Sequence, residues 1–600
     1  MARILNELFI DTVEKIVKSG EVPIIIYEAP TGYGKTTSSI SFYSVTSRYG
    51  IASSLIHVLP MRSIAIELYC KIANALGGGE AASKYCEEFG RDAAIERALA
   101  DLDISLADVG YQFMDPIDSS KSPFFLKTLL ITTFNSFFHN LARVPVGEFR
   151  KYRRHYEVPR AAIFTSSMVL DEAHLYGGDP GGGSETSVIT AFIVSVKALA
   201  EARVPLLIES ATLPTQLLDT LKEIIVDSGA TPTTISFRYS RCCSSLPHTV
   251  DSSNSVVCHD KEYVDRCLKV RWVTDVISDE ELALVVKDHV SRGDSVLIVR
   301  NTVEKAVSTY LKLKEAFNNI ALIHGRFTKS DRAKKLSQCR RAEVAVATQV
   351  IEAGVNLNFD VLITDAASPS SIVQRAGRIA RDCREGEAYV YVVKSDGDSV
   401  YDEVVTREFT RKLIDLTRDS KYVIEWRIPS EKLVDSRISF LKIMNEVYAG
   451  RRLVFDVERY SVLTEIITKP LITQDELSKV IYRYKSILYS SVLTPVYVGR
   501  ELPSSMEELL SNSVPLSLNY IQKFASKLLR KYGCDLGVIA LKCTNDFSEC
   551  GIIEYKVRAD ILKDPVRLFM TRILDNNHVI SPLAFIARSS AYSAEVGLRV

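Results

Sequence analysis

The stretch Glu28–Thr36, which reads Glu-Ala-Pro-Thr-Gly-Tyr-Gly-Lys-Thr, constrains the fold of this chain more than any other. It follows an apolar run, Pro23–Tyr27, that is typical of a buried strand, and it precedes a segment, Thr36–Tyr43, that can form a helix. A glycine loop between a strand and a helix is the context in which backbone N–H groups and the positive end of a helix bind phosphate. The pattern therefore predicts a phosphate-binding loop in an α/β fold.

Within this loop, Gly32 and Gly34 allow the backbone N–H groups to turn toward an anion. Lys35 would reach the β- and γ-phosphates of a nucleotide, and the Thr36 hydroxyl would ligate Mg²⁺. The strict pattern has glycine where Ala29 stands, so an ordinary tight turn between strand and helix is the alternative. The residues expected around the phosphates are Thr31, Gly32, Tyr33, Gly34, Lys35, Thr36 and Thr37.

The composition narrows the class of protein. A chain of 600 residues is long enough for three or four domains of about 150 residues each. Lys+Arg and Asp+Glu both number 74, so the net charge is zero, which excludes a non-specific polycation and leaves a local groove as the way to bind nucleic acid. There is no run of about 18 apolar residues, so we expect no membrane span.

Cysteine and histidine usage argues against a metal centre. The eleven cysteines contain no C-x-x-C pair, and the nine histidines do not cluster. Structural zinc sites and His-Asp phosphohydrolases both need several closely spaced ligands. We therefore expect neither, and we expect free, buried thiols in a reducing cytosol.

Strand-like and helical runs alternate in two blocks, which predicts two parallel sheets covered on both faces. The strand-like runs are Pro23–Tyr27, Ser53–Leu59, Leu126–Thr132, Ser167–Asp171 and Leu206–Glu209 in the first block, and Ser295–Arg300, Ile320–Ile323, Glu343–Ala347, Val361–Thr364 and Ala388–Val393 in the second. We predict a first domain at 1–240 with a helical insertion at about 77–122, a linker at 241–268, a second domain at 269–424 and a mainly helical C-terminal domain at 425–600. Two strand-like runs, Gly537–Lys542 and Ile552–Arg558, stand out in the last part.

The sequence Asp171-Glu172-Ala173-His174 follows the fourth strand of the first block. Asp171 can hold the Mg²⁺ that bridges the phosphates, and Glu172 can orient and deprotonate the attacking water. Taken alone, this tetrapeptide could be a solvated helix start, but the phosphate loop upstream favours the catalytic interpretation. Ser210 and Thr212 follow the next strand, and their hydroxyls can hydrogen-bond to Asp171 or His174.

The second block has no phosphate loop, but it contains Gln374-Arg375-Ala376-Gly377-Arg378-Ile379-Ala380-Arg381. Its three arginines are spaced by three residues, which predicts that they share one side of a helix. Guanidinium groups presented in this way can bind phosphate oxygens in bidentate fashion from a second domain. The alternative is a basic, solvated helix face, which Gly377 inside the helix disfavours.

With both blocks considered, the chain resembles a superfamily-two helicase, and more closely the helicase of CRISPR-associated type I interference. The stretches that carry the resemblance are Ala29–Thr36, Leu59–Ser63, Leu130–Phe134, Val169–Tyr176, Glu209–Pro214, Ala321–Arg332, Thr348–Asp360 and Val373–Arg381. The resemblance covers about residues 20–395 and is specific as a set. It implies an α/β chain of two tandem RecA-like domains followed by an accessory domain.

The resemblance also implies cofactors, partners and residue roles. The cofactors are ATP and Mg²⁺, the latter held by Thr36 and Asp171, and the partners are single-stranded DNA and an RNA-guided surveillance complex. The residues implied in catalysis are Lys35, Asp171, Glu172, Gln374, Arg378 and Arg381; those beside the nucleotide include His174, Glu352 and Gly354; those on the DNA backbone are Pro60, Arg62, Thr132, Thr133 and Thr348; and those that couple the domains are Ser210 and Thr212.

Three departures from the family pattern matter. No Gln precedes the phosphate loop to read adenine, and Asn356 and Asn358 stand where relatives often have Asp, so the contacts to base and ribose differ. Only about 20 residues precede the first strand, so the family's N-terminal His-Asp nuclease is not expected here. We therefore predict a cytoplasmic, helicase-only protein that works with a separate nuclease subunit.

Two other functions fit the same residues. One is a different superfamily-two helicase, acting in DNA repair or on RNA, because the nucleotide chemistry is the same. The other is an ATP-dependent switch that binds nucleic acid without unwinding it. Glu172 disfavours the switch, since a pure switch does not need rapid hydrolysis.

Overall fold

The structure is a computed structural model of the 600-residue chain. The residues that it describes are 4–30, 33–77, 86–87, 89–113, 119–144, 155–177, 186–238, 248–250, 255–258, 260–352, 357–381, 383–395, 397–418, 422–430, 433, 436–470, 472–473, 476, 488, 493–517, 520–521, 536–545, 548–557, 573–575, 577–587 and 591–599. The chain divides into two compact units, one formed by Met1–Leu297 and Ile351–Leu477, the other by Ile298–Val350 and Ser478–Val600.

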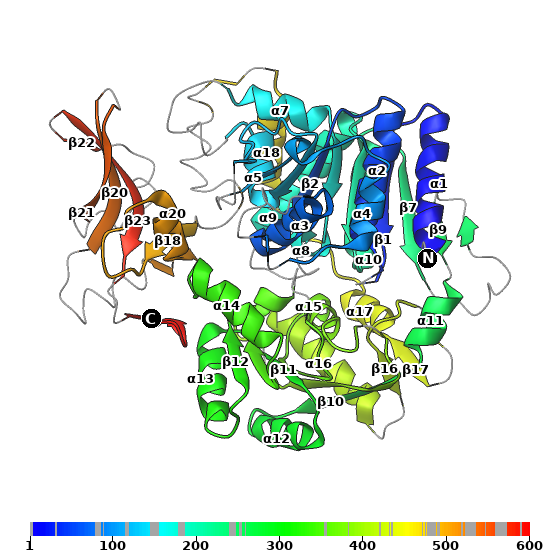
Figure 1. The fold of residues 1–600 in the computed structure, drawn as a ribbon. Coiled ribbons are helices and arrows are strands. Elements are labelled where there is room, and N and C mark those ends of the chain that lie inside the picture. Colours follow the sequence, from blue (N-terminus) through cyan, green and yellow to red (C-terminus); the bar gives the residue numbers. More distant parts are fainter. Residues whose placement is uncertain are drawn as a thin grey trace. The chain divides into compact units, whose positions relative to one another are not determined.

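The first part of the chain forms a nine-stranded sheet with the strand order β3-β4-β2-β5-β6-β1-β7-β9-β8 (Figure 1). Every pair in it is parallel except β8–β9. The elements are α1 (Ile4–Lys18), β1 (Ile24–Glu28), α2 (Lys35–Arg48), β2 (Leu55–Leu59), α3 (Arg62–Ala75), α4 (Ala93–Leu99), η1 (Leu106–Asp108), β3 (Val109–Gln112), β4 (Leu129–Thr133), α5 (Phe134–Leu141), α7 (Glu157–Phe164), β5 (Ser167–Leu170), α8 (His174–Gly177), α9 (Thr186–Glu201), β6 (Leu206–Ser210), α10 (Thr215–Asp227), β7 (Pro232–Phe237), β8 (His248–Val250), β9 (Ser255–Cys258) and α11 (Lys261–Cys267).

The central strands of this sheet are buried along their whole length. Each residue of β1, β2, β4, β5 and β6 is inaccessible to solvent or nearly so, which is the pattern of a parallel sheet covered on both faces. Because β2, β5, β6 and β1 are consecutive neighbours and parallel, the loops that follow them meet at one edge of the sheet. That edge, the carboxyl edge, carries the motifs that the sequence singled out.

Two stretches of the first part differ from prediction. The predicted linker, 241–268, contributes β8 and β9, and β9 pairs in parallel with β7, so this stretch extends the sheet. The predicted helical insertion, 77–122, contains α4 and η1 but also β3, which pairs with β4 at the sheet edge. In both stretches short strands gain backbone hydrogen bonds from an existing edge, a gain that the local polarity of the sequence does not reveal.

The second block forms a six-stranded sheet with the order β10-β15-β14-β11-β13-β12. Its elements are β10 (Val270–Ile277), α12 (Leu282–Arg292), β11 (Val296–Val299), α13 (Val303–Lys314), β12 (Ile320–Ile323), α14 (Lys329–Cys339), β13 (Val344–Ala347), η3 (Gln349–Ile351), β14 (Val361–Asp365), α15 (Pro369–Ala376), β15 (Gly386–Val393) and α16 (Glu403–Thr417). The pairs β10–β15, β15–β14 and β12–β13 are parallel. The predicted α/β class with two parallel sheets is therefore confirmed.

The last part of the chain holds strands as well as helices. Its elements are β16 (Val423–Glu425), β17 (Arg437–Ser439), α17 (Phe440–Tyr448), α18 (Val457–Thr468), β18 (Leu493–Tyr497), α20 (Met506–Ser511), β19 (Ser513–Ser517), β20 (Leu536–Thr544), β21 (Cys550–Val557), β22 (Ile573–Asp575), β23 (His578–Ile586), β24 (Tyr592–Ser593) and β25 (Gly597–Leu598). The two strand-like runs of the sequence lie in β20 and β21, which form a long antiparallel pair. The mainly helical expectation agrees with α17 and α18 but does not include this sheet, because the alternating polarity of the sequence indicated only two of its strands.

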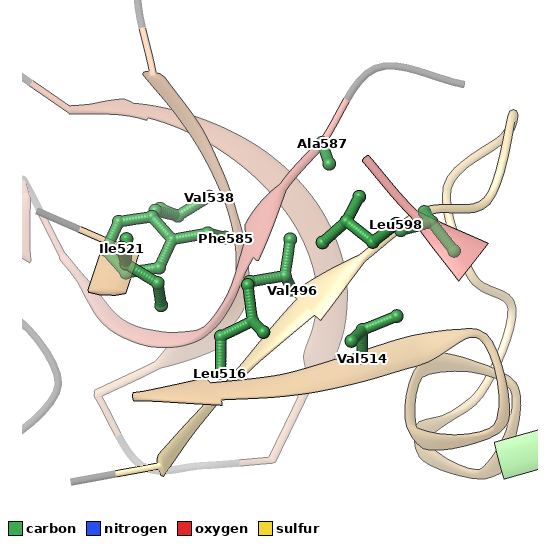
Figure 2. Packing of buried hydrophobic residues seen from close by; sticks show 9 residues of the cluster. Val496, Val514, Leu516, Ile521, Val538, Phe585, Ala587 and Leu598 are labelled. Carbon is green, nitrogen blue, oxygen red and sulfur yellow. The ribbon is translucent and has the colours of Figure 1, made fainter. Parts of the chain in front are cut away.

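The sheet β19-β18-β23-β20-β21 has an apolar core of its own. Figure 2 shows Val496 and Leu516 from neighbouring strands beside Phe585 and Val538. Leu598, close to the end of the chain, belongs to the same buried cluster. This core ties β25 to a sheet whose strands lie up to about a hundred residues earlier in the sequence.

Six of the cysteines form disulfides, namely Cys70–Cys86, Cys267–Cys383 and Cys543–Cys550. The expectation of free thiols is wrong for these six and holds for Cys339, which is buried and free. Sequence spacing could not reveal Cys267–Cys383, since its partners are 116 residues apart. Among the helices that the structure describes, none is both long and apolar enough to cross a membrane.

Candidate active site

The predicted phosphate loop joins β1 to α2 at the carboxyl edge. Gly34 is the residue before α2 and has φ 109°, a left-handed conformation that residues with a side chain rarely adopt. Lys35 opens the helix, and its Nζ donates to the carbonyl of Ala29 at 3.4 Å. Thr36 is the next residue of the helix, and Thr31 and Gly32 lie outside the described residues. The N-terminus of α2 thus points toward the carboxyl edge, which favours an anion there.

Two neighbours hold the start of α2 in place. The Thr37 hydroxyl donates to the carbonyl of Gly34 at 2.6 Å, and the Asn6 amide on α1 donates to the Thr37 oxygen at 3.3 Å. Tyr33 is buried, and its hydroxyl donates to Asp260 at 2.5 Å. These contacts hold Tyr33, Gly34 and Thr37, the described residues at the end of the loop and the start of α2.

Asp171 follows β5 and is buried. Its Oδ1 accepts the backbone N–H of Glu172 at 2.7 Å, and its Oδ2 lies 3.3 Å from Nε2 of His57 on β2. Burial raises the pKa of Asp171, but the hydrogen bond and charge of His57 and the charge of Lys35 outweigh it, so the net shift is downward. Asp171 is therefore an ionised carboxylate at neutral pH, as a ligand to a cation must be.

Glu172, His174 and Ser210 meet beside Asp171. His174 Nδ1 lies 3.0 Å from Ser210 Oγ and 3.5 Å from Glu172 Oε2. Because Ser210 Oγ donates to the carbonyl of Thr212 at 2.9 Å, the histidine must donate to Ser210 through Nδ1–H. Burial lowers the pKa of His174, so the ring is neutral and its Nε2 carries a lone pair. The predicted coupling residues are thus in one hydrogen-bonded chain.

Two residues at this edge were missed by the sequence analysis. His57 interrupts the apolar strand Leu-Ile-His-Val-Leu, and Glu209 interrupts Leu-Leu-Ile-Glu-Ser. Both are buried in their strands, and Glu209 accepts a hydrogen bond from Ser39 Oγ on α2 at 2.8 Å. A titratable residue in the middle of a fully buried strand was the signal that could have found them.

Arg375 differs from its predicted role. It is fully buried and bonded to the Glu352 carboxylate at 2.8 Å, to the Thr364 hydroxyl at 2.7 Å and to the Tyr401 hydroxyl at 2.8 Å. These contacts hold α15 against β14. Arg375 therefore stabilises the second sheet and does not present its guanidinium at a surface.

The three arginines do not share one helix face, because α15 ends at Ala376. Gly377 caps the helix, and the chain then forms an isolated parallel bridge between Ile379 and Phe359. Arg378 therefore lies in the turn that follows the helix, and Arg381 lies in a turn beyond the bridge. Backbone pairing with Phe359 offsets the loss of further helical turns, and the i, i+3 spacing could not anticipate this.

Arg378 is the arginine that approaches the first sheet. It is buried, donates to the carbonyl of Glu352, and feels the charges of Glu172 and Glu352. Burial and the charge of Arg381 lower its pKa to about 10, so it keeps its proton at neutral pH. Gln374 is buried on α15, the Arg381 N–H donates to Asn358 Oδ1 at 3.0 Å, and Gly354 lies outside the described residues.

The residues predicted to touch DNA follow neighbouring strands. β2 and β4 pair in register, with Leu59 opposite Thr133, so Pro60 and Arg62 emerge beside Thr132 and Thr133. The Thr132 hydroxyl donates to the carbonyl of Gln112 at 2.6 Å, and Thr133 caps α5. In the other compact unit, Thr348 follows β13 and is buried.

Comparison with known proteins finds similarity to CRISPR-associated helicases and, over 111 residues at 30% identity, to the ATP-dependent RNA helicase DBP5 of Kluyveromyces lactis, which covers 17% of this chain and 24% of that protein. The family described as "CRISPR-associated nuclease/helicase Cas3, C-terminal" matches residues 292–384. The CRISPR-associated nuclease/helicase Cas3 of Methanothermobacter thermautotrophicus is 25% identical over 419 residues, which is 66% of this chain and 42% of that protein. The CRISPR-associated helicase Cas3 of Thermoproteus tenax is 25% identical over 289 residues, 46% of this chain and 43% of that protein. The chain thus spans less than half the length of these relatives.

Solved structures share the fold. The crystal structure of T. fusca Cas3 with AMPPNP covers 86% of this chain, with a TM-score of 0.56, 15% identity and 64% of that chain matched. T. fusca Cas3 without that nucleotide gives a TM-score of 0.55 and 16% identity over 84% of this chain and 63% of that chain. The two parallel sheets are therefore RecA-like, and the chain resembles the CRISPR-associated Cas3 helicases of superfamily two.

Proposed function

We propose that this chain is an ATP-dependent translocase on single-stranded DNA that unwinds target DNA in type I CRISPR interference. One observation carries the proposal: the buried ring of His174, which lies 3.0 Å from Ser210 Oγ and 3.5 Å from Glu172 Oε2, is close enough to Glu172, Lys35, Asp171 and Arg378 for all four charges to act on its pKa. A charge set of this composition matches the requirements of phosphoryl transfer to water.

The residues present fit ATP and Mg²⁺. The left-handed Gly34 and the start of α2 form an anion-binding turn, and Lys35 contacts only a backbone carbonyl in the contacts described. Thr36 and the ionised Asp171 would hold Mg²⁺, which suits hard oxygen ligands. Bound here, ATP would supply the phosphoanhydride bond whose hydrolysis releases the energy for movement.

Glu172 is the residue that we assign to the attacking water. Its φ of 52° is a left-handed conformation that a residue with a side chain adopts at a cost of about 1–3 kcal/mol, and such strain is concentrated at functional sites. Its Oε2 is buried without a hydrogen-bond partner among the described residues and lies near neutral His174. Glu172 would orient the water and accept its proton, and His174 would transmit the change to Ser210 and Thr212.

Arg378 would stabilise the charge that develops on the phosphates. Its guanidinium is planar and charged at neutral pH, so it can bind two phosphate oxygens at once. Gln374, Arg381, Glu352 and Gly354 would complete the nucleotide site from the second sheet, as the family resemblance implies.

The residues that the family resemblance assigns to DNA would contact its backbone, so binding would be largely independent of sequence. They are Pro60, Arg62, Thr132 and Thr133 in one compact unit and Thr348 in the other. We further propose that the protein acts in the cytoplasm with an RNA-guided surveillance complex, and that a separate His-Asp nuclease subunit cuts the strand.

The test is ATP turnover without nucleic acid, with single-stranded DNA and with single-stranded RNA. We expect strong stimulation by DNA that is lost in Lys35→Ala, whereas an exposed control on α10, Glu223→Gln, behaves as wild type. Stimulation by RNA alone would replace this function with RNA remodelling. Turnover that neither nucleic acid changes would favour the switch.

A further inference from the structure

His57, Asp171 and Glu209 come from three adjacent strands but share one face of the sheet. Val169 on β5 pairs with His57 on one side and with Leu207 on the other. Asp171 comes two residues after Val169, and Glu209 comes two residues after Leu207. Side chains two residues apart on a strand point to the same face. One ligand atom from each residue can therefore meet the others, and these three atoms lie within 4.8 Å of one another.

The three side chains are buried from solvent, and one of their oxygens has no hydrogen-bond partner among the described residues. Glu209 and His57 are almost fully buried, and Asp171 is 7% exposed. One oxygen of Glu209 accepts from Ser39, and the other, Oε1, has no hydrogen-bond partner among the described residues. A buried carboxylate oxygen without a partner costs free energy, most of all next to a second carboxylate. Something that this chain does not supply is needed at that oxygen, either a proton or a cation.

The donor set identifies the class of cation. Mg²⁺ and Ca²⁺ take oxygen ligands, whereas an imidazole nitrogen together with carboxylates suits first-row transition ions such as Mn²⁺, Co²⁺ and Zn²⁺. Two carboxylates also match a divalent charge. Lys35 is close enough for its charge to act on Asp171 and Glu209, but its Nζ donates to the Ala29 carbonyl.

We propose that His57, Asp171 and Glu209 bind one divalent first-row transition ion in the absence of nucleotide. The proposal goes beyond the proposed function, because an ion that depends on phosphate oxygens needs the nucleotide, whereas these three ligands come from the protein alone. Asp171 would then carry a bound ion before ATP arrives, and the chain would prefer Mn²⁺ over Mg²⁺ at this position.

The experiment uses the full chain without an affinity tag, freed of metal by a chelator and kept free of nucleotide. Free Mn²⁺ is measured by electron paramagnetic resonance during a titration. We expect about one bound ion per wild-type chain, and dissociation constants at least 10-fold higher in His57→Gln and Glu209→Gln. His289→Gln is the matched control, since His289 is also buried beside a carboxylate, Asp294 at 2.7 Å, but belongs to no group of three such ligands among the described residues.

Competition sharpens the assignment. A 100-fold excess of Mg²⁺ should leave Mn²⁺ bound to the wild type and displace it from His57→Gln, because only the imidazole distinguishes the two ions. Glu209→Gln keeps the shape of a protonated carboxyl and should fold, as judged by its melting temperature, so it decides the outcome if His57→Gln is unstable.

The inference is overturned if the wild type binds no Mn²⁺, or if Glu209→Gln binds it as tightly as the wild type does. In the first case, a proton on Glu209 is the occupant of the gap. The proposed function fails separately, through loss of DNA-stimulated ATP turnover measured with Mg²⁺. Mn²⁺ binding without such turnover would remove the proposed function and leave the metal site standing.

Discussion

Glu209 and Glu425 are two glutamates with no solvent exposure, in two regions of the same compact unit, and their surroundings differ. Glu425, on β16, accepts from Trp272 Nε1 at 3.0 Å, from the N–H of Arg427 at 3.0 Å and from Arg437 at 3.1 Å. Among the described residues, Glu209 accepts one hydrogen bond, from Ser39. Burial raises the pKa of both carboxyl groups. The negative charge of Asp171 raises the pKa of Glu209 further, whereas the hydrogen bonds to Glu425 oppose the rise.

The difference in hydrogen bonding between Glu425 and Glu209 distinguishes a structural carboxylate from one at the candidate active site. Both oxygens of Glu425 accept hydrogen bonds, from Trp272, Arg437 and two backbone N–H groups, so the carboxylate fixes β16 and β17 against β10. At the carboxyl edge, Glu172, His174 and Glu209 each keep a buried polar atom without a hydrogen-bond partner among the described residues. Unsatisfied buried groups are costly, and they persist where a ligand completes them.

The largest expected effect is on catalysis at the unsatisfied edge. Glu172→Gln keeps the shape of the side chain but removes its capacity to accept a proton, and we expect ATP turnover to fall about 10³-fold. The melting temperature should stay within a few degrees of wild type. If the variant loses activity only because it unfolds, Glu172 has a structural role like that of Glu425, and the contrast between the two regions does not hold.

The second-largest expected loss of ATP turnover follows substitution of Arg378. Arg378→Ala removes the positive charge that acts on Glu172, and we expect turnover to fall about 10²- to 10³-fold with ATP binding less affected. Arg271→Ala removes an exposed arginine that pairs with Glu387 at 3.0 Å and serves as the control. Equal turnover in both variants would mean that Arg378 has no role at the phosphates.

A paired stability measurement tests the comparison directly. Glu425→Gln places an amide where Arg437 and Trp272 need an acceptor, and we expect about 2 kcal/mol of destabilisation. Glu209→Gln should cost less than about 1 kcal/mol, because one of its oxygens has no partner to lose. Urea denaturation of both variants gives the two values, and a reversed order would show that Glu209 is structural.

The smallest expected effect is on the pH dependence of stability, and it comes from His324 in the other compact unit, a histidine with hydrogen bonds at both ring nitrogens. His324 Nε2 donates to the carbonyl of Val596 at 3.2 Å, and its Nδ1 accepts the N–H of Arg326 at 3.1 Å. Burial and the charge of Arg326 lower its pKa to about 3. Because the unfolded chain binds a proton there below an ordinary pKa of about 6.5 and the folded chain does not, stability must fall as the pH falls from 6.5 toward 3.

Between pH 7 and pH 5.5, this histidine should account for about 1 kcal/mol of lost stability. His324→Gln should remove that part of the pH dependence, measured as the shift of the urea midpoint with pH. If the urea midpoint changes with pH equally in wild type and variant, the burial of His324 and its hydrogen bond to the Val596 carbonyl do not keep the ring neutral.

Each predicted strand in the two blocks overlaps an observed one within a few residues, because these strands are mostly apolar. The strands β7 and β10, which carry polar residues inside, were not predicted. The phosphate loop and the stretch Asp171–His174 could be found because their chemistry lies in contiguous residues. His57 and Glu209 each interrupt an apolar run, but their proximity could not be predicted, since it depends on the strand order β2-β5-β6, which no local pattern encodes. Arg378 was found for a reason that proved wrong, since it lies in the turn after α15 and not on a helix.

The disulfide between Cys267 and Cys383 has a mechanical consequence. It closes the chain between these residues, and with it the strands β10, β11, β12, β13 and β14, into a covalent ring. A load applied along the backbone would bypass the 116 residues of this ring, which would otherwise extend by about 400 Å when fully stretched. A protein that pulls on a polymer would thereby keep most of one sheet out of the line of force.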